Sequence, residues 1–323
     1  MIMLQTILRR VLIMIPQMIL VSILIFMLAQ LMPGDPFYGN LNPNSDPATI
    51  ERMRHAAGLD LPWYEQYIRW VDHVLHGDLG TSYTVNKGWS VTRLIEQRLW
   101  PTLSMGILAT ILTYLLAITQ ALLAARHENK LIDRALIVWN TLTSAVPSFV
   151  FYFIMMILFV YIIPIFPSSG TGIDDTKNFA VNFFSNLRYA FLPGFTIALF
   201  STNGVFQYLR SNLLDQQAQD YVRTARAKGV QIKDVFRKHI LRNAFLPIAS
   251  GIGYAITGVL AGAMFAETVF GYPGIGALFV QALSGRDYTV ITALMLLQGF
   301  LALLGGLLSD IISAWVDPRI RVK

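Results

Sequence analysis

The sequence contains no cysteine, and only 14% of its 323 residues are charged. The absence of cysteine excludes disulfide scaffolds, thiolate metal sites and cysteine nucleophiles. Soluble globular proteins carry about a quarter charged residues, whereas 54% of the residues here are hydrophobic. So few polar side chains cannot cover the surface of a water-soluble fold. The composition therefore predicts an integral membrane protein.

The chain also lacks the motifs of nucleotide-binding and hydrolytic sites. No Gly-x-x-x-x-Gly-Lys-Ser/Thr loop is present to bind ATP phosphates, and neither His-Glu-x-x-His nor Gly-x-Ser-x-Gly occurs. His73 and His76 have the spacing of a helical metal pair, but no third ligand accompanies them. We therefore expect no catalytic residue, no metal and no cofactor, and a membrane-embedded enzyme is the weaker hypothesis.

Six apolar segments are long enough to cross about 30 Å of hydrocarbon, which takes about 20 helical residues. The first follows Arg9 and Arg10 as a signal peptide would, but it is too long for the apolar region of one, so we expect a retained anchor. The pattern predicts an all-α membrane protein with six transmembrane helices. The expected spans are 11–32, 99–125, 135–165, 189–209, 245–266 and 288–315.

The basic residues predict the orientation of these spans. Six spans place both termini on one side, and sixteen of the 25 Lys and Arg residues fall on that side. Because cytoplasmic loops carry the excess of Lys and Arg, both termini are expected in the cytoplasm. The net charge of +6 is then an orientation signal, and nucleic-acid binding is not expected.

A long outer segment, residues 33–98, separates the first two spans. Apolar residues recur at near-helical spacing over 50–75, which predicts a small helical cap on the outer membrane face. Its aromatic residues suit either a docking face for another protein or a structural lid; they are Trp63, Tyr64, Tyr67 and Trp70. We divide the chain into an anchor with its cap, residues 1–100, and a five-helix core, residues 101–323.

Few ionisable residues fall within the spans. Asp310 and Glu267 lie near the ends of the sixth and fifth spans, where a carboxylate reaches water or pairs with a neighbour. Uncharged polar residues such as Asn203 and Gln207 can line a wet path or bond one helix to another. The Gly258-Val-Leu-Ala-Gly262 spacing permits close helix approach, either inside the bundle or between subunits.

The cytoplasmic loop 210–244 has the sharpest local pattern. Asp220 is expected to cap a helix of about two turns, which Gly229 ends in a left-handed conformation. Ala225 and Ala227 would permit close approach to another protein. The helix could dock into a groove on a partner or lie on anionic lipid, and the spacing alone does not separate these alternatives.

Several motifs, spread from end to end, together resemble one family. They are Asp220-Tyr-Val-Arg-Thr-Ala-Arg-Ala-Lys-Gly229, Lys238-His-Ile-Leu-Arg-Asn-Ala244 followed by Leu246-Pro247, Leu31-Met-Pro-Gly-Asp-Pro36, Gly77-Asp-Leu-Gly-Thr-Ser82, Glu267-Thr-Val-Phe-Gly-Tyr-Pro-Gly-Ile-Gly276 and Asp317-Pro-Arg-Ile-Arg321. The chain resembles the B-type permease subunit of oligopeptide and dipeptide ABC importers. It departs from the general Glu-Ala-Ala-x-x-x-Gly pattern, because Arg223, Thr224 and Ala225 precede Gly229.

The resemblance implies a type I ABC importer permease fold in a bacterial cell membrane, with no enzymatic activity of its own. Expected partners are a homologous C-type permease subunit, two cytoplasmic ABC ATPases, an extracytoplasmic peptide-binding protein and membrane lipid. A permease of the same family for nickel chelates or glutathione, and a stand-alone secondary transporter, are the alternatives. The implied ATPase-coupling residues are Asp220, Tyr221, Arg223, Thr224, Ala225, Arg226, Ala227, Lys228 and Gly229. Candidates for an outer gate or path are Glu267, Gly271, Pro273, Gly274, Asn203 and Gln207.

Overall fold

The computed structural model describes residues 2–32, 52, 55, 60–174, 176, 178–261 and 263–316. Within these residues the chain is helical apart from loops and one isolated bridge between Thr81 and Ser90. The helices are α1 (Ile2–Leu31), α3 (Trp63–Leu75), α4 (Val91–Arg126), α5 (Leu131–Ala145), α6 (Ser148–Met156), η2 (Ile157–Ile162), α7 (Phe179–Gln217), α8 (Asp220–Ala227), α9 (Ile232–Val235), η3 (Phe236–Ile240), α10 (Leu241–Ala244), α11 (Leu246–Ala261), α12 (Met264–Val269), α13 (Ile275–Gly285) and α14 (Tyr288–Val316).

Five helical segments are long and apolar enough to cross a membrane, and a bent pair makes up to six. The five are Ile7–Leu31, Val91–Arg126, Ala180–Gln217, Gly251–Val269 and Tyr288–Val316. The all-helical, multi-span prediction is confirmed. α4 begins at Val91, so this helix runs across the division expected at residue 100.

The third expected span, 135–165, is not one continuous helix. α5 and the helical stretch Ser148–Ile162 meet at an angle of 98°. The break lies at Val146, whose extended backbone (φ −80°, ψ 133°) precedes Pro147. Proline lacks the amide hydrogen that continues a helix, and it disfavours helical backbone in the residue before it. Counted as one bent span, the pair still supplies the sixth expected span, and Pro147 marks the bend in the sequence.

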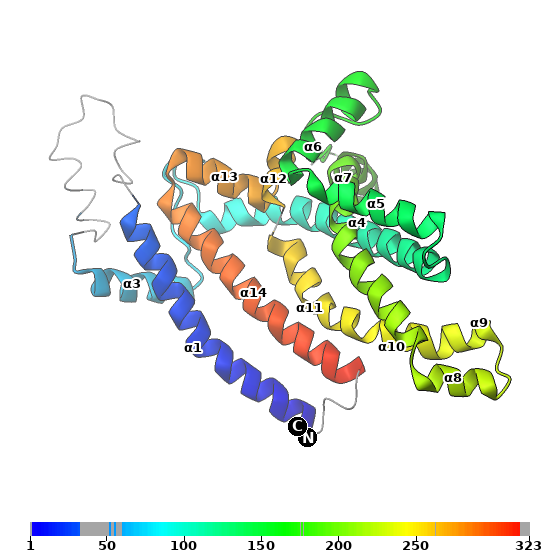
Figure 1. The fold of residues 1–323 in the computed structure, drawn as a ribbon. Coiled ribbons are helices and arrows are strands. Elements are labelled where there is room, and N and C mark those ends of the chain that lie inside the picture. Colours follow the sequence, from blue (N-terminus) through cyan, green and yellow to red (C-terminus); the bar gives the residue numbers. More distant parts are fainter. Residues whose placement is uncertain are drawn as a thin grey trace.

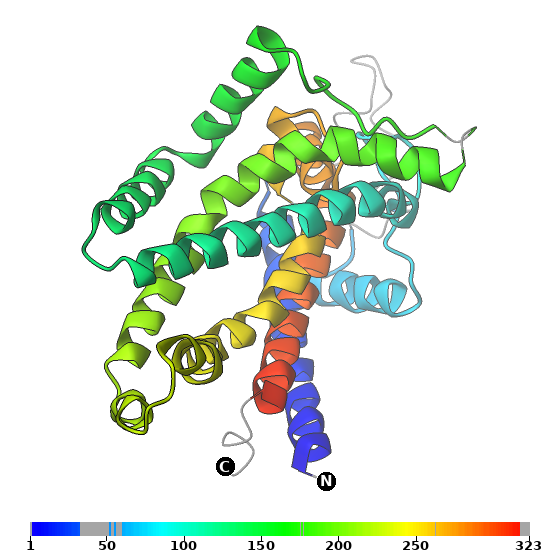
Figure 2. The same ribbon diagram turned by 90° about the vertical axis from the view of Figure 1, so that its right-hand side faces the viewer.

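The long helices pack in two groups. α4 crosses α7, while α11 and α1 both pack against α14 (Figures 1 and 2). α11 packs closely on α14 at Gly253, where an added Cβ would overlap the backbone of Ser309 and Gly305. Gly258 meets nothing within 4 Å, and Gly262 lies outside the described residues. Within this chain, the close approach of α11 to α14 uses Gly253, and the Gly258 spacing stays a prediction for contact between subunits.

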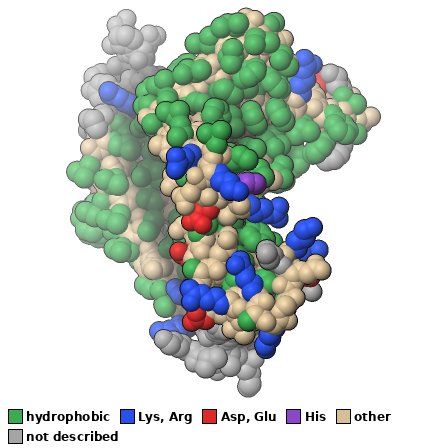
Figure 3. Space-filling view, turned by 45° about the vertical axis from the view of Figure 1, so that its right-hand side comes forward, with side chains coloured by type: hydrophobic (Ala, Val, Ile, Leu, Met, Phe, Trp, Pro, Cys, Tyr) green, Lys and Arg blue, Asp and Glu red, His purple; other side chains and the backbone are tan. Residues whose placement is uncertain are grey.

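The two ends of the molecule carry different elements. α8 and α9 lie toward the end where α1 begins and α14 ends, while α12 and α13 lie toward the opposite end (Figures 1 and 2). Most Lys and Arg side chains visible in Figure 3 gather over the end with α8 and α9, beneath a broad hydrophobic surface. Arg10 Nε lies 3.0 Å from Asp310 Oδ2 at this end. The expectation that Asp310 pairs with a neighbour is confirmed.

Candidate functional site

α8 forms as a short helix with a sharp end. Gln219 precedes it without a side-chain cap, so Asp220 is the first helical residue and not the predicted cap. In the first turn the Asp220 carboxylate still offsets the helix dipole. Gly229 has φ +76°, and the Val230 amide donates to the Ala225 carbonyl at 3.2 Å. The predicted left-handed stop at Gly229 is confirmed.

One face of α8 packs inward and the other is exposed. Val222 is buried, Tyr221 and Ala225 pack against the same hydrophobic cluster, and the Tyr221 hydroxyl donates to Gln216 Oε1 at 2.7 Å. Ala225 is half-buried and packs partly against the protein's own core. The opposite face is exposed; it carries Arg223, Thr224 and Ala227, and Arg226, Lys228 and Gly229 are exposed beside it.

The segment after α8 fastens it to the long helices. Val235, Ile240 and Ala244 are buried in the cluster that also contains Phe206, Leu209 and Leu213 of α7. Small residues of α4 complete the cluster; they are Ala117, Ala121, Ala124 and Ala125. The Arg126 guanidinium also lies over the Phe236 ring, 5.3 Å from its centroid. Packed side chains thus connect the α8 segment to α4 and α7.

A buried ion pair near this cluster was missed by the sequence analysis. Arg210 donates to Asp133 through Nε at 2.6 Å and through Nη2 at 2.7 Å, and the Asn129 amide donates to the same carboxylate at 2.9 Å. The Asp133 side chain is only 2% exposed. The pair joins the start of α5 to α7, ten residues before α8 begins. Seventy-seven residues separate the partners, so no local sequence signal links them.

Glu267 lies in the interior at the opposite end of the molecule. It is fully buried, so of the two expected alternatives, contact with water or with a neighbour, the structure shows contact with neighbours. Its carboxylate accepts hydrogen bonds from the Thr102 hydroxyl at 3.0 Å and from the Ala277 amide at 2.8 Å. Thr102 also accepts from the Ile275 amide at 2.8 Å. Glu267 and Thr102 together satisfy the amino-terminal amides of α13.

The glycines of the Glu267 motif make room for its carboxylate. An added Cβ at Gly274 would lie 2.2 Å from the Glu267 carboxyl group, and one at Gly276 would lie 2.6 Å from the Met264 backbone. Gly271 has φ +57° in the turn that Pro273 follows. We call this motif, residues 267–276, the corner. Its glycines leave room for the buried Glu267 carboxylate, which is surrounded by backbone atoms.

Tyr272, in the same corner, anchors it to α7 and α4. Its hydroxyl donates to Asn186 Oδ1 at 2.7 Å and lies 3.0 Å from Ser104 Oγ. Burial raises the pKa of Tyr272 to about 12. The phenol therefore stays protonated and remains a donor across the physiological pH range.

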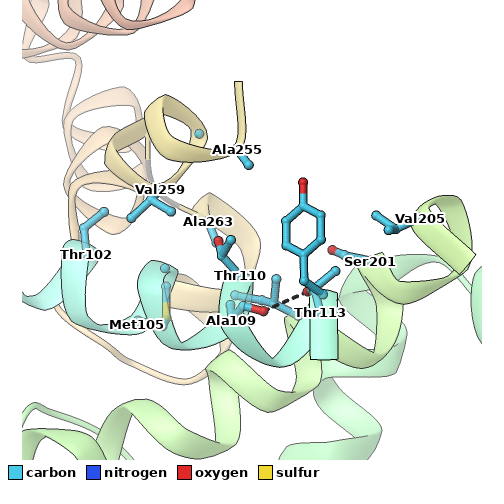
Figure 4. A pocket seen from close by; sticks show the side chains of 14 residues that line it. Thr102, Met105, Ala109, Thr110, Thr113, Ser201, Val205, Ala255, Val259 and Ala263 are labelled. Carbon is cyan, nitrogen blue, oxygen red and sulfur yellow. Dashed lines mark hydrogen bonds between the residues drawn. The ribbon is translucent and has the colours of Figure 1, made fainter. Parts of the chain in front are cut away.

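A groove runs along α4, α7 and α11. One pocket, with a volume of about 260 Å³, is lined by Thr102, Thr110 and Thr113 of α4, Ser201 of α7 and Ala255 of α11, among others (Figure 4). A second, of about 590 Å³, continues toward Arg242 and Trp315. The two pockets share Thr110, Tyr114 and Ala255, so they form one groove.

The groove walls are apolar with scattered hydroxyl groups. Among the described residues that line the two pockets, Arg242 is the one charged side chain. Asn203 and Gln207 lie elsewhere: Asn203 donates to Ser144 Oγ at 2.9 Å, and Gln207 donates to Asn203 Oδ1 at 2.9 Å. The α4 threonines were not predicted as site residues, although their spacing of eight and three residues places them on one helical face.

Comparison with known proteins assigns the family. The family model described as "Binding-protein-dependent transport system inner membrane component" matches residues 117–322, and the model for the amino-terminal part of such components matches residues 3–106. The chain belongs to this family. It is therefore a multi-pass membrane protein and a transport component.

Two curated relatives cover nearly the whole chain. The oligopeptide transport system permease protein AppB of Bacillus subtilis (strain 168) is 37% identical over 315 residues, which is 98% of each chain. The dipeptide transport system permease protein DppB of Lactococcus lactis subsp. cremoris (strain MG1363) is 33% identical over 320 residues, which is 99% of this chain and all of the relative. The resemblance to peptide-importer permeases is thus confirmed.

A solved structure shares the fold. The MetNI methionine ABC transporter, in an inward-facing conformation, contains a chain that matches with a TM-score of 0.55 at 15% identity. The match covers 70% of this chain and 97% of that chain. At this identity the likeness shows the fold alone, which is that of an ABC transporter permease.

Proposed function

We propose that this chain is the membrane-spanning permease subunit of an ATP-driven peptide importer. Relatives named for oligopeptide and dipeptide transport, each aligned over almost the whole chain, support peptides as the cargo class. The sequence has no ATP-binding loop, so partner ATPases would supply the energy. A homologous permease subunit, two such ATPases and an extracytoplasmic binding protein would complete the importer.

The observation that carries the proposal is the connection between α8 and the groove. The exposed face of α8 offers Arg223, Thr224 and Ala227 to a partner, while its inner face packs into a cluster that also contains residues of α4 and α7. Both of these helices line the groove. Closure of the ATPases on ATP would displace α8, and the shared cluster would carry that displacement into the groove walls.

The groove would form this chain's half of the translocation path. Its hydroxyl groups can bond a peptide backbone, and its apolar walls accept side chains of many kinds. Arg242 is the one charged side chain among the described residues that line this half of the path, so this half would not select by side-chain charge, and selection would rest with the binding protein.

The corner around Glu267 would close the outer end of the path. Thr102 lines the groove and donates to Glu267, and the turn with Gly271, Pro273 and Gly274 fixes that contact. In this arrangement α8 and both termini face the cytoplasm, as the distribution of Lys and Arg indicates. The MetNI comparison structure is inward-facing, and alternation between inward and outward states would move the cargo.

Uptake by the reconstituted importer tests this function. Liposomes with both permease subunits, the ATPases and the binding protein should accumulate labelled peptide only when ATP is supplied to the ATPases. Uptake by this chain alone on an ion gradient would instead show a secondary transporter. Accumulation of a nickel chelate or glutathione, with peptide excluded, would contradict peptides as the cargo.

A further inference from the structure

α3 has apolar and polar residues on opposite sides. With 3.6 residues per turn, one continuous side carries Trp63, Tyr64, Tyr67, Ile68, Trp70, Val71, Val74 and Leu75. The other side carries Glu65, Gln66, Arg69, Asp72 and His73. No residue of α3 is buried, so its apolar side is only partly covered by the rest of the protein.

α3 rests against the flank of α1 and not on its end. The Tyr67 hydroxyl lies 2.8 Å from Ser22 Oγ, and Gln30 Nε2 donates to Gln66 Oε1 at 2.8 Å. The Phe26 ring lies 5.5 Å from the Tyr67 ring and 5.8 Å from the Trp70 ring, centroid to centroid. Figure 1 shows α3 beside the carboxyl-terminal third of α1.

These contacts fix the depth of α3 along a membrane span. Arg10 marks the charged end of the span through its ion pair with Asp310. Twenty residues beyond it, at 1.5 Å per residue, the helix has crossed about 30 Å and reaches Gln30. Ser22 lies eight residues before Gln30, so the Tyr67 contact is about 12 Å inside the hydrocarbon boundary. The Gln30–Gln66 bond falls at that boundary.

The exposed apolar edge of α3 continues the lipid-facing surface of α1. Ile68 and Leu75 are 63% and 79% exposed, and Leu24 and Leu28 of α1 are exposed on the neighbouring helix. A water-facing edge with these side chains at this depth would be costly, because apolar area buried in lipid stabilises by about 25 cal/mol per Å². Trp63 and Tyr64, also exposed, are the residue types enriched at membrane interfaces.

We propose that α3 lies in the lipid leaflet next to the carboxyl-terminal end of α1, as an interfacial helix whose Ile68 and Leu75 contact acyl chains. Its polar side, with Arg69, faces the headgroups and water. The helix is an anchor that holds the following loop against the membrane surface. A docked binding protein is the competing occupant of the same edge, and the experiment separates the two. This placement of α3 depends on the protein's location in a membrane and does not depend on peptides being its cargo.

Spin labels on single cysteines test this placement, because the chain has no native cysteine. Ile68→Cys and Leu75→Cys are labelled in the complete importer in liposomes, and collision rates are measured with oxygen, which concentrates in lipid, and with a water-soluble nickel complex. Leu28→Cys on α1 is the lipid-facing control, and Lys87→Cys is the water-facing control. Arg69→Cys reports the polar side of α3.

If Ile68 and Leu75 contact lipid, the ratio of the oxygen collision rate to the nickel collision rate should be several-fold higher at positions 68 and 75 than at 69 and 87. At 68 and 75 it should be close to the ratio at position 28. Addition of saturating binding protein should leave the ratios at 68 and 75 unchanged. A nickel-accessible label at either position would overturn the proposal. A label at 68 or 75 that becomes protected when the binding protein is added would also overturn it, and would assign the edge to that protein.

Discussion

The Gly274 position sets the fit between a buried carboxylate and the start of α13. Gly274→Ala should lower stability by about 1–3 kcal/mol, because its Cβ would overlap the Glu267 carboxyl group. Gly274 has φ −104°, which alanine adopts, so the cost comes from overlap and not from backbone strain. Thermal unfolding of the purified protein measures the change.

A matched control uses Gly204, where an added Cβ meets nothing within 4 Å. Gly204→Ala should be neutral or stabilising, since alanine is the better helix former. Equal stability of the Gly274 and Gly204 variants would refute the account of the corner.

Residue-scale features were predictable only where they depend on local backbone. Gly229 was found from its place after a short helical pattern, and the structure gives it the expected left-handed φ. The burial of Glu267 was not predictable, because it depends on Thr102, which is 165 residues away in the sequence. The partial packing of Ala225 against the core was not predictable for the same reason, since its cluster also contains residues of α4 and α7.

At the element scale, the Asp133–Arg210 pair joins α5 to α7. Asp133→Asn should destabilise the protein toward the lower end of the about 3–5 kcal/mol typical of a broken buried pair, because Arg210 is partly exposed. Arg210→Lys keeps the charge but loses the two-pronged contact, so its loss should be intermediate. Unfolding in denaturant provides the measurement.

Asp220→Asn is the control for this pair. Asp220 lies 3.5 Å from Arg223, and both side chains are highly exposed, so its replacement should change stability little. An Asp133 variant as stable as the Asp220 variant would show that the buried pair does not hold α5 in place.

The apolar runs predicted the number and order of the membrane spans. They did not predict where the helices end or break. α7 extends from Phe179 to Gln217, beyond the predicted 189–209, because polar residues continue the helix outside the apolar run. The break at Pro147 lies within an apolar stretch, so hydropathy alone could not reveal it. The outer cap was predicted as a helix, and α3 covers Trp63–Leu75 of it; residues 33–51, 53, 54 and 56–59 of that segment lie outside the described residues.

The whole molecule should have α8 and the loop before α4 on opposite sides of the membrane. Cysteine at Gln231, which is exposed after α8, should react with a membrane-impermeant thiol reagent only after the cells are opened. Cysteine at Lys87 should react in intact cells, or in intact spheroplasts if an outer membrane is present. The reverse labelling pattern would overturn the orientation inferred from the Lys and Arg distribution.

In the whole molecule, α8 would link the partner ATPases to the groove along α4, α7 and α11. Its exposed face is available to a partner, and its packed face belongs to the cluster that also contains residues of α4 and α7. On spacing alone, the sequence supported docking on a protein and resting on lipid equally. A charge placed on the exposed face separates these two possibilities.

Ala227→Glu tests this central claim most directly, with Ala180→Glu as the matched control. Ala180 is an exposed alanine in the first turn of α7, outside the α8 segment. In a docked α8 the new carboxylate is left without a partner in the interface. We predict that Ala227→Glu assembles with the second permease subunit but loses ATPase association and ATP-driven uptake, while Ala180→Glu keeps both. Normal ATPase association and uptake in the Ala227 variant would contradict the account.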